Sequence, residues 1–167
     1  VLVNAQMGLT TSQQNFSPLK WGEVGKSKKN KIDYTLLEGK QTHSTKTETE
    51  QTINFVNANK QVLSVVFKLA NDGLAFRYQI KTSQDEKILK DLTVYPIAEG
   101  TKRWIQKYIP DSYEAFYPLT TAGYDANRPN NRLWAYPALM EISNGLYLFL
   151  TESNITYNHC ASRLNNQ

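Results

Sequence analysis

Residues 71–80 read Asn-Asp-Gly-Leu-Ala-Phe-Arg-Tyr-Gln-Ile, and this stretch decides the fold class of the chain. Apolar residues alternate with others on both sides of the Asp72-Gly73 pair: Leu63, Val65, Phe67 and Leu69 before it, and Leu74, Phe76, Tyr78 and Ile80 after it. A two-residue period is typical of a β-strand, because successive side chains point to opposite faces. Asp-Gly between two such runs predicts a hairpin with a primed turn, in which glycine takes a positive φ at little cost. We therefore expect two antiparallel strands here, with Phe67 and Phe76 buried between them and the rest of the protein.

Strand-like patterns recur along the whole chain. Extended segments are expected at residues 1–10, 32–38, 42–56, 61–70, 74–81, 88–97, 102–109, 134–143 and 146–151. Residues 11–30 are polar and turn-rich, and Asn144-Gly145 predicts a second primed hairpin turn. Helical periodicity is almost absent. Many short strands joined by turns favour an all-β antiparallel sandwich, and residues 1–167 are expected to form a single domain.

The composition is that of a soluble globular protein. Of 167 residues, 40% are hydrophobic and 20% are charged. No apolar run approaches the roughly 20 residues that a membrane helix requires. The chain begins at Val1 inside a strand-like segment rather than at a methionine. We therefore expect that the chain is an excised piece of a longer protein and that a leader, if the protein has one, lies outside it.

The basic residues do not predict a nucleic-acid partner, although the formal net charge is +4. They are scattered singly, apart from four lysines between Lys26 and Lys31. That cluster lies in a segment rich in Gly, Ser and Asn, and we expect a solvated loop rather than a phosphate-binding patch.

Cysteine and histidine chemistry is also disfavoured. Cys160 is the single cysteine, so neither an internal disulfide nor a cysteine-based zinc site can form. His43 and His159 are the two histidines, too few for a typical histidine-based metal site. His159 and Cys160 are adjacent, and neighbours on a strand point to opposite faces, which argues against a nucleophile–base pair.

Residues 110–131 differ from the rest of the chain. Their prolines and glycine exclude a regular central strand, and the aromatic residues between them argue against disorder: Tyr113, Phe116, Tyr117 and Tyr124. Glu114 lies inside this aromatic loop, and Glu152 ends the last predicted strand. A carboxylate beside aromatic rings is either a charge on the rim of an exposed loop or part of a sugar site, because rings stack on pyranose faces while carboxylates bind hydroxyls. No pair of carboxylates is marked as the facing acid and base that glycoside hydrolysis needs.

Three segments, in order, carry a resemblance to a known family. They are residues 71–78, then Trp104 followed by Tyr113-Glu114, then residues 145–152, which read Gly-Leu-Tyr-Leu-Phe-Leu-Thr-Glu. Together with an early strand over residues 1–9, they resemble the N-terminal β-sandwich domain of glycoside hydrolase family 97, across nearly the whole chain. Gln79 departs from the family pattern, which usually has a glutamate there.

The resemblance implies an antiparallel β-supersandwich of the galactose mutarotase type, here a truncated fragment. It would pack on a separate C-terminal (β/α)8 barrel that supplies the catalytic acid and base, so no catalytic residue is expected in this chain. The sandwich would contribute one glutamate, Glu114, to a calcium ion in the active site, and Tyr113 and Tyr117 would contact the sugar. The parent would be an exo-acting, calcium-dependent α-glucosidase or α-galactosidase that takes α-linked oligosaccharides. It would be exported to a bacterial periplasm, and the fragment alone would hold no calcium.

Two other functions remain open on the sequence. The chain could be an autonomous carbohydrate-binding module that uses Tyr113, Phe116, Tyr117 and Trp134. It could also be an enzyme of the aldose-epimerase type on the same fold. That enzyme needs an acid/base pair, typically with a histidine, and His43 and His159 are poorly placed to provide it.

Overall fold

The computed structural model describes residues 5–83, 85–112, 114–121, 134–157, 159 and 161–165, and this part of the chain is all-β. Eleven strands and no helix occur within these residues. Accordingly, they include no helix long and apolar enough to cross a membrane. The described residues divide into two compact units, one over Ala5–Val94 and one from Tyr95 onward.

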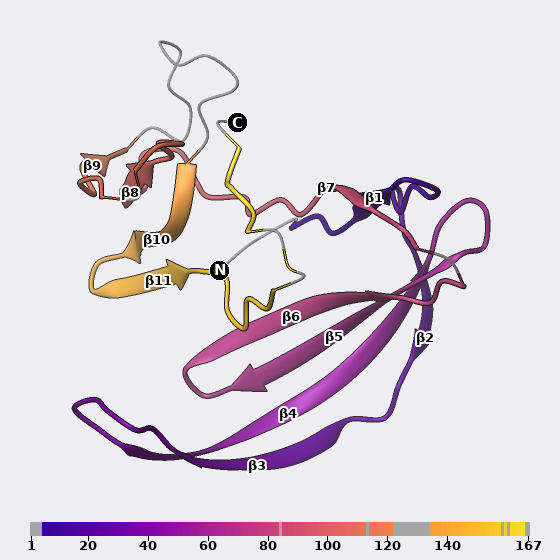
Figure 1. The fold of residues 1–167 in the computed structure, drawn as a ribbon, viewed down its shortest axis with the longest axis horizontal. Helices are drawn as coiled ribbons and strands as arrows, with labels where there is room; N and C mark the ends of the chain where they lie inside the picture. The colour runs from indigo at the N-terminus through magenta and orange to yellow at the C-terminus, as the bar shows by residue number, and fades with distance from the viewer. Residues whose placement is uncertain are drawn as a thin grey trace. The chain divides into compact units, whose positions relative to one another are not determined.

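The first unit is built on a five-stranded antiparallel sheet (Figure 1). Its strands are β2 (Lys20–Val24), β3 (Lys28–Thr35), β4 (His43–Val56), β5 (Val62–Ala70) and β6 (Gly73–Ile80). The spatial order is β2-β4-β5-β6, and β3 pairs with the part of β4 that β2 leaves free. Two short strands, β1 (Leu9–Thr11) and β7 (Ile88–Asp91), pair with each other.

The predicted hairpin is confirmed as β5–β6, but its register differs from the one that a two-residue turn at Asp72-Gly73 would give, because Ala70 pairs with Gly73. Phe67 lies opposite Phe76, and Val65 lies opposite Tyr78. Burial is nevertheless uneven along the hairpin: Val65 is fully buried, whereas Phe67 and Phe76 are only half-buried, so their predicted burial is wrong. The reason is that the core of this unit forms at the end of the hairpin away from its turn. There Leu9, Phe16 and Leu63 pack together, with further contacts from Leu19, Tyr78 and Ile80.

The hairpin turns differ from the expected type. The β5–β6 loop consists of Asn71 and Asp72, while Gly73 is the first residue of β6 and has no positive φ. The primed turn predicted at Asp72-Gly73 is therefore wrong, and a loop with negative φ closes this hairpin. In the second hairpin Gly145 does take a φ of 80°, but Asn144 does not have a positive φ. A type I′ turn needs both, and the pairing here shifts register between Glu141 and Ser143 instead.

The lysine cluster lies mostly on a strand rather than in a loop, which corrects that expectation. Lys28, Lys29 and Lys31 all belong to β3, and among the described strands β3 pairs only with β4. Lysine on an edge strand discourages pairing with another chain, so polar composition does not exclude a strand at such an edge. The same argument covers β2, which the turn-rich reading of residues 11–30 missed.

The second unit is a four-stranded antiparallel sheet in the order β11-β10-β8-β9. The strands are β8 (Lys102–Lys107), β9 (Leu119–Thr120), β10 (Trp134–Ser143) and β11 (Leu146–Leu150). Pro137 lies in β10 where the pairing with β8 shifts register, which is where a proline within a sheet is tolerated. One face of the sheet carries the core of the unit: Ile105, Trp134, Ala138 and Met140 are buried there, packed against Ile97, Leu148, Leu150 and Leu164.

Two predicted strands are shorter than expected. Of residues 1–10, the described part pairs only at Gln6 and from Leu9 onward. The strand expected at residues 88–97 ends at Asp91, whose carboxylate accepts hydrogen bonds from the backbone N–H and the hydroxyl of Thr93. A local bond of this kind competes with strand pairing and turns the chain.

Candidate functional site

Glu114 lies in the loop between β8 and β9, and its side chain is exposed. Its backbone N–H donates to Ser112 Oγ at 3.1 Å, which orders the start of the loop. Its carboxylate has no hydrogen-bond or ion-pair partner among the described residues. A carboxylate in this position is available to bind a ligand together with groups from another surface.

A metal ion could not be held by Glu114 alone. Calcium takes six to eight oxygen ligands. Within the described residues, no three or more His, Cys, Asp or Glu side chains gather closely enough to bind a metal ion. Glu114 therefore fits calcium as a single ligand, and the remaining ligands would have to come from elsewhere.

The aromatic residues near Glu114 have very different exposures. Phe116 is almost fully exposed and Tyr117 is partly exposed. Tyr113, which was expected to contact the sugar, lies outside the described residues, as does Tyr124 of the same aromatic segment. Trp134 is only 7% exposed and belongs to the core of the second unit. Its expected role as a sugar-stacking residue is therefore wrong, since its ring is covered by protein.

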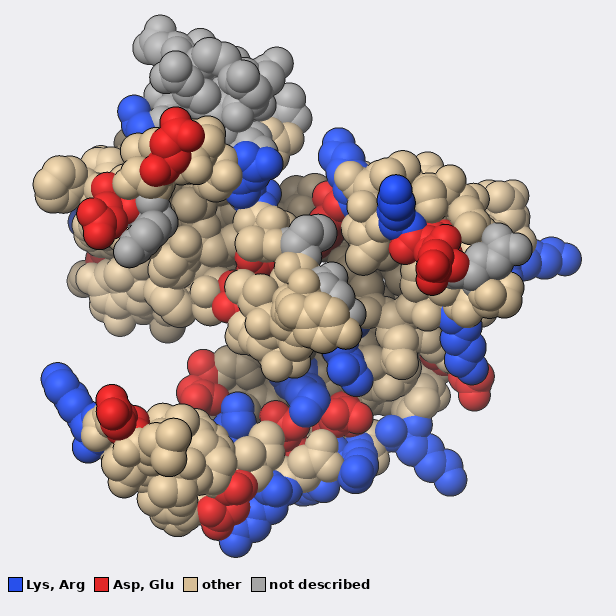
Figure 2. All heavy atoms as spheres, in the orientation of Figure 1, with Lys and Arg blue, Asp and Glu red and all other residues tan. Residues whose placement is uncertain are grey.

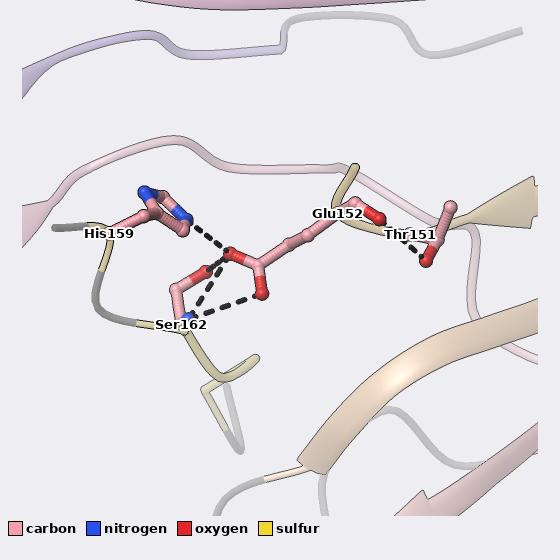
Figure 3. Close-up of polar contacts among 4 residues, drawn as sticks. All are labelled: Thr151, Glu152, His159 and Ser162. Carbon is pink, nitrogen blue, oxygen red and sulfur yellow. Dashed lines mark hydrogen bonds and ion pairs between the residues drawn. The ribbon is translucent and has the colours of Figure 1, made fainter. Parts of the chain in front are cut away.

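Glu152, the second glutamate singled out by the sequence, is held within the protein (Figure 3). Its Oε1 accepts hydrogen bonds from Ser162 Oγ at 2.6 Å and from the Ser162 backbone N–H at 3.1 Å. His159 Nε2 lies 3.6 Å from the same oxygen. The carboxylate thus ties the end of β11 to the C-terminal segment, ten residues further along the chain.

The combination of serine, histidine and acid around Glu152 does not have the order of a catalytic triad. In a triad the histidine lies between the nucleophile and the acid, so that it can take the serine proton. Here the acid lies between the serine and the histidine. The cluster is a structural clamp, and no motif in the sequence joined Ser162 to Glu152. Cys160 lies outside the described residues.

The most buried carboxylate of the first unit is also structural. Glu48 on β4 is 5% exposed and accepts a hydrogen bond from Lys68 Nζ at 2.7 Å, while Glu50 lies 3.5 Å from the same nitrogen. The hydrogen bond from Lys68 lowers the pKa of Glu48, against the opposing effect of burial. The same bond raises the pKa of Lys68. A carboxylate stabilised as an anion by a fixed cation is a poor proton donor near neutral pH.

Arg103 on β8 is a buried cation that organises the second unit. Its guanidinium donates to the backbone carbonyls of Thr121 at 2.9 Å and Ala98 at 3.2 Å. Burial lowers its pKa. Arg103 thus ties the segment before β8 to the residue that follows β9.

Basic side chains do not form a continuous patch on the visible face (Figure 2). Lysines and arginines alternate there with acids, most clearly over the large sheet of the first unit. An open groove on that sheet is lined by Lys29, Lys31 and Lys46 together with threonines of β4 and Asp72. Its lining offers solvated charges and hydroxyls rather than a pair of facing carboxylates.

Comparison with known proteins agrees with the fold. Residues 1–167 match the family model described as Glycosyl-hydrolase 97 N-terminal. The crystal structure of a beta-arabinopyranosidase is similar, with a TM-score of 0.86 and 21% sequence identity, covering 99% of this chain and 28% of that chain. No curated protein matches. The expected all-β antiparallel sandwich fold is confirmed, and the whole-length family match establishes that the chain belongs to the N-terminal domains of glycoside hydrolase family 97.

Proposed function

We propose that this chain is the non-catalytic N-terminal domain of a calcium-dependent, exo-acting α-glycosidase, called here the parent protein. The match of all 167 residues to an N-terminal domain of a hydrolase family carries this proposal. The chain spans 28% of the length of the similar beta-arabinopyranosidase, so most of such a protein lies outside the matched part. The parent's (β/α)8 barrel would supply the catalytic acid and the base or nucleophile at the ends of its strands.

The proposed contribution of this chain to the active site is one carboxylate, that of Glu114. Two observations support the choice: the Glu114 side chain is exposed, and its carboxylate has no partner among the described residues. The Glu152 carboxylate is instead engaged by Ser162. Calcium, when bound, would orient the sugar and polarise an oxygen of the reacting group. The Glu114 carboxylate would be a ligand of that ion, and Tyr113 and Tyr117 would contact the sugar beside it.

The proposed substrates are α-linked glucosides or galactosides, and the proposed compartment is the bacterial periplasm. The similar structure belongs to an enzyme named for an arabinopyranoside, which is also a pyranoside. We therefore include aryl arabinopyranosides beside aryl α-glucosides and α-galactosides in the assay that follows. The isolated chain should hydrolyse none of them, because it lacks a complete acid/base pair. Turnover by the isolated chain that a substitution in it abolishes would overturn the proposal.

Calcium dependence of the parent protein tests the role of Glu114. We expect Glu114→Gln to weaken calcium affinity and turnover together while leaving the thermal unfolding of the domain unchanged. Glu152→Gln is the matched control. We expect it to lower the thermal stability of the domain and to lower calcium affinity less than Glu114→Gln does. The opposite pattern, with calcium affinity lost in Glu152→Gln and kept in Glu114→Gln, would assign the ligand to Glu152. If neither variant changes the calcium dependence of the parent protein, the domain contributes neither glutamate to the metal site.

A further inference from the structure

Both faces of the second unit's sheet carry apolar side chains, but among the described residues only one face forms a buried core. The register aligns Phe149, Leu139, Trp104 and Leu119 in one row that crosses β11, β10, β8 and β9. Directly paired residues of antiparallel strands share a face, so these four side chains lie side by side on one face. Along each strand they alternate with side chains that point to the opposite face, where the core lies. We call these four residues, together with Tyr147, the outer row.

Three large side chains of the outer row are exposed, while Leu139 and Trp104 are half-buried. Phe149 is 60% exposed, Leu119 is 56% exposed and Tyr147 is 53% exposed. The rings of Trp104 and Tyr147 lie 6.2 Å apart across the intervening strand β10, with an angle of 45° between their planes. Four strands about 4.8 Å apart make the row about 14 Å wide. Contiguous apolar surface on this scale marks an interaction site more often than a free surface.

Charge on this face is neutralised locally. Glu141 lies opposite both Tyr147 and Lys102 in the neighbouring row, and its carboxylate forms an ion pair of 3.0 Å with Lys102. A partner for this face needs apolar surface rather than a complementary charge.

We propose that the outer row is the surface on which the catalytic part of the parent protein docks. This inference rests on the proposed function and deepens it, because it names the face that joins the two parts. The matched part is 28% of the similar hydrolase chain, and the family is one of N-terminal domains, so a large partner in the same polypeptide is available. Interfaces between domains of one chain bury roughly 600–1,500 Å², which a four-stranded face can supply.

The composition of the row favours a protein partner over a sugar. Leu139 and Leu119 alternate with the aromatic residues, and aliphatic side chains offer no stacking face for a pyranose. The tilt of 45° between Trp104 and Tyr147 also prevents a shared flat platform. Interface cores are typically aromatic and aliphatic, with charges at the rim, as Lys102 and Glu141 are here.

Hydroxyl-radical footprinting of the parent protein and of the isolated chain tests the proposal. Labelling of Trp104, Tyr147 and Phe149 should fall by about tenfold in the parent protein, as for residues in the dry core of an interface. Leu37 and Tyr157, both fully exposed, are controls that should label equally in the two proteins. Equal labelling of the outer row in both proteins would overturn the proposal.

Other occupants of the face give distinct results. Protection that appears in the isolated chain only as its concentration rises would assign the row to a second copy and overturn the proposal. Protection that appears only with added maltose or melibiose would assign it to a sugar and overturn it also. A parent protein that hydrolyses no glycoside yet protects the row would contradict the proposed function and leave the docking face supported.

A substitution in the parent protein gives an independent readout. Phe149→Asp should restore labelling of Trp104 and Tyr147 toward the level of the isolated chain and reduce turnover several-fold. Tyr157→Asp is the matched control, with no expected effect on either measurement. The isolated chain carrying Phe149→Asp should keep its circular dichroism spectrum, since this side chain is exposed. Unchanged protection in the Phe149→Asp parent would count against docking on this face.

Discussion

The hydroxyl of Tyr78 accepts a hydrogen bond from the backbone N–H of Gly8, 3.1 Å away and 70 residues earlier in the chain. Thr93 Oγ1 lies 2.5 Å from the same hydroxyl, and Thr93 in turn donates to Asp91. Tyr78 is the last residue of the family-like segment at residues 71–78, and Gly8 belongs to the early one. The hydrogen bond therefore gives a physical reason for two parts of the sequence pattern that lie far apart in the chain.

Tyr78→Phe should destabilise the first unit by about 1–3 kcal/mol, the cost of leaving a part-buried backbone donor without its acceptor. Urea denaturation followed by circular dichroism measures this loss. Tyr157→Phe is the control and should have no effect, because the Tyr157 side chain is fully exposed. Equal stability of the Tyr78→Phe and wild-type proteins would show that water replaces the hydroxyl.

Gly8→Ala should destabilise the same unit by about 1–3 kcal/mol through steric overlap. A Cβ atom on Gly8 would lie 2.8 Å from the carbonyl oxygen of Phe16 and 3.4 Å from Cβ of Leu92. Gly73→Ala is a matched control, because a Cβ there meets nothing within 4 Å. The melting temperatures of the two variants provide the comparison, and equal losses would contradict the argument.

Leu63→Ala should cost about 2–5 kcal/mol, because Leu63 is fully buried in the core of the first unit. Phe67→Ala should cost less despite the larger side chain that it removes, since Phe67 is half-buried and contacts Phe76 near the turn. Chemical denaturation of both variants ranks the two losses. A greater loss in Phe67→Ala would place the core nearer to the turn than the structure does.

The Glu48–Lys68 ion pair should make stability depend on pH at both extremes. The pKa of Glu48 is lowered from 4.5, so its contribution is complete above pH 4.5 and is lost as the pH falls through the lower, folded-state pKa. The pKa of Lys68 is raised from 10.5, so its contribution is complete below pH 10.5 and is lost as the pH rises through the folded-state value. The stability difference between the wild type and Lys68→Met should thus be largest between these limits.

Denaturation of the wild type and of Lys68→Met between pH 3 and pH 7 tests the acid side of this expectation. Lys29→Met is the control, because Lys29 lines the open groove and has no ion pair among the described residues. Its stability difference from the wild type should change little with pH. If the stability difference between the wild type and Lys68→Met stays constant down to pH 3, protonation of Glu48 does not break the ion pair in this range.

Glu152→Gln should destabilise the second unit by about 1–3 kcal/mol, since it weakens the charge-assisted hydrogen bonds from Ser162. Glu114→Gln should change stability by less than about 0.5 kcal/mol, as expected for an exposed side chain. Thermal unfolding of the isolated chain distinguishes the two. The comparison separates the structural role of Glu152 from the binding role that we propose for Glu114.

The alternation of side chains was sufficient to identify most of the strands. The segments expected at residues 42–56, 61–70, 74–81 and 134–143 agree with β4, β5, β6 and β10 within one residue at each end. Period-2 patterning works best in β5, where Leu63 and Val65 lie on one face and are fully buried, so a register slip of one residue would expose them. The edge strand β2 was missed for the complementary reason, since an edge strand with few buried contacts has no such pattern. The strand expected at residues 32–38 overlaps β3, which begins four residues earlier, at Lys28.

By itself the sequence determined the all-β class, the existence of the β5–β6 hairpin and the family, because these depend on local alternation and on ordered short segments. Only the tertiary structure decided which of the apolar residues are buried. It placed Trp134 in the core and left Leu119, Tyr147 and Phe149 exposed, although all of these residues look alike in the sequence. It also separated the carboxylate of Glu152, which Ser162 binds, from that of Glu114, which has no partner among the described residues. Burial and pairing depend on partners distant along the chain, such as Ser162 for Glu152 and Gly8 for Tyr78, and a local pattern carries no information about them.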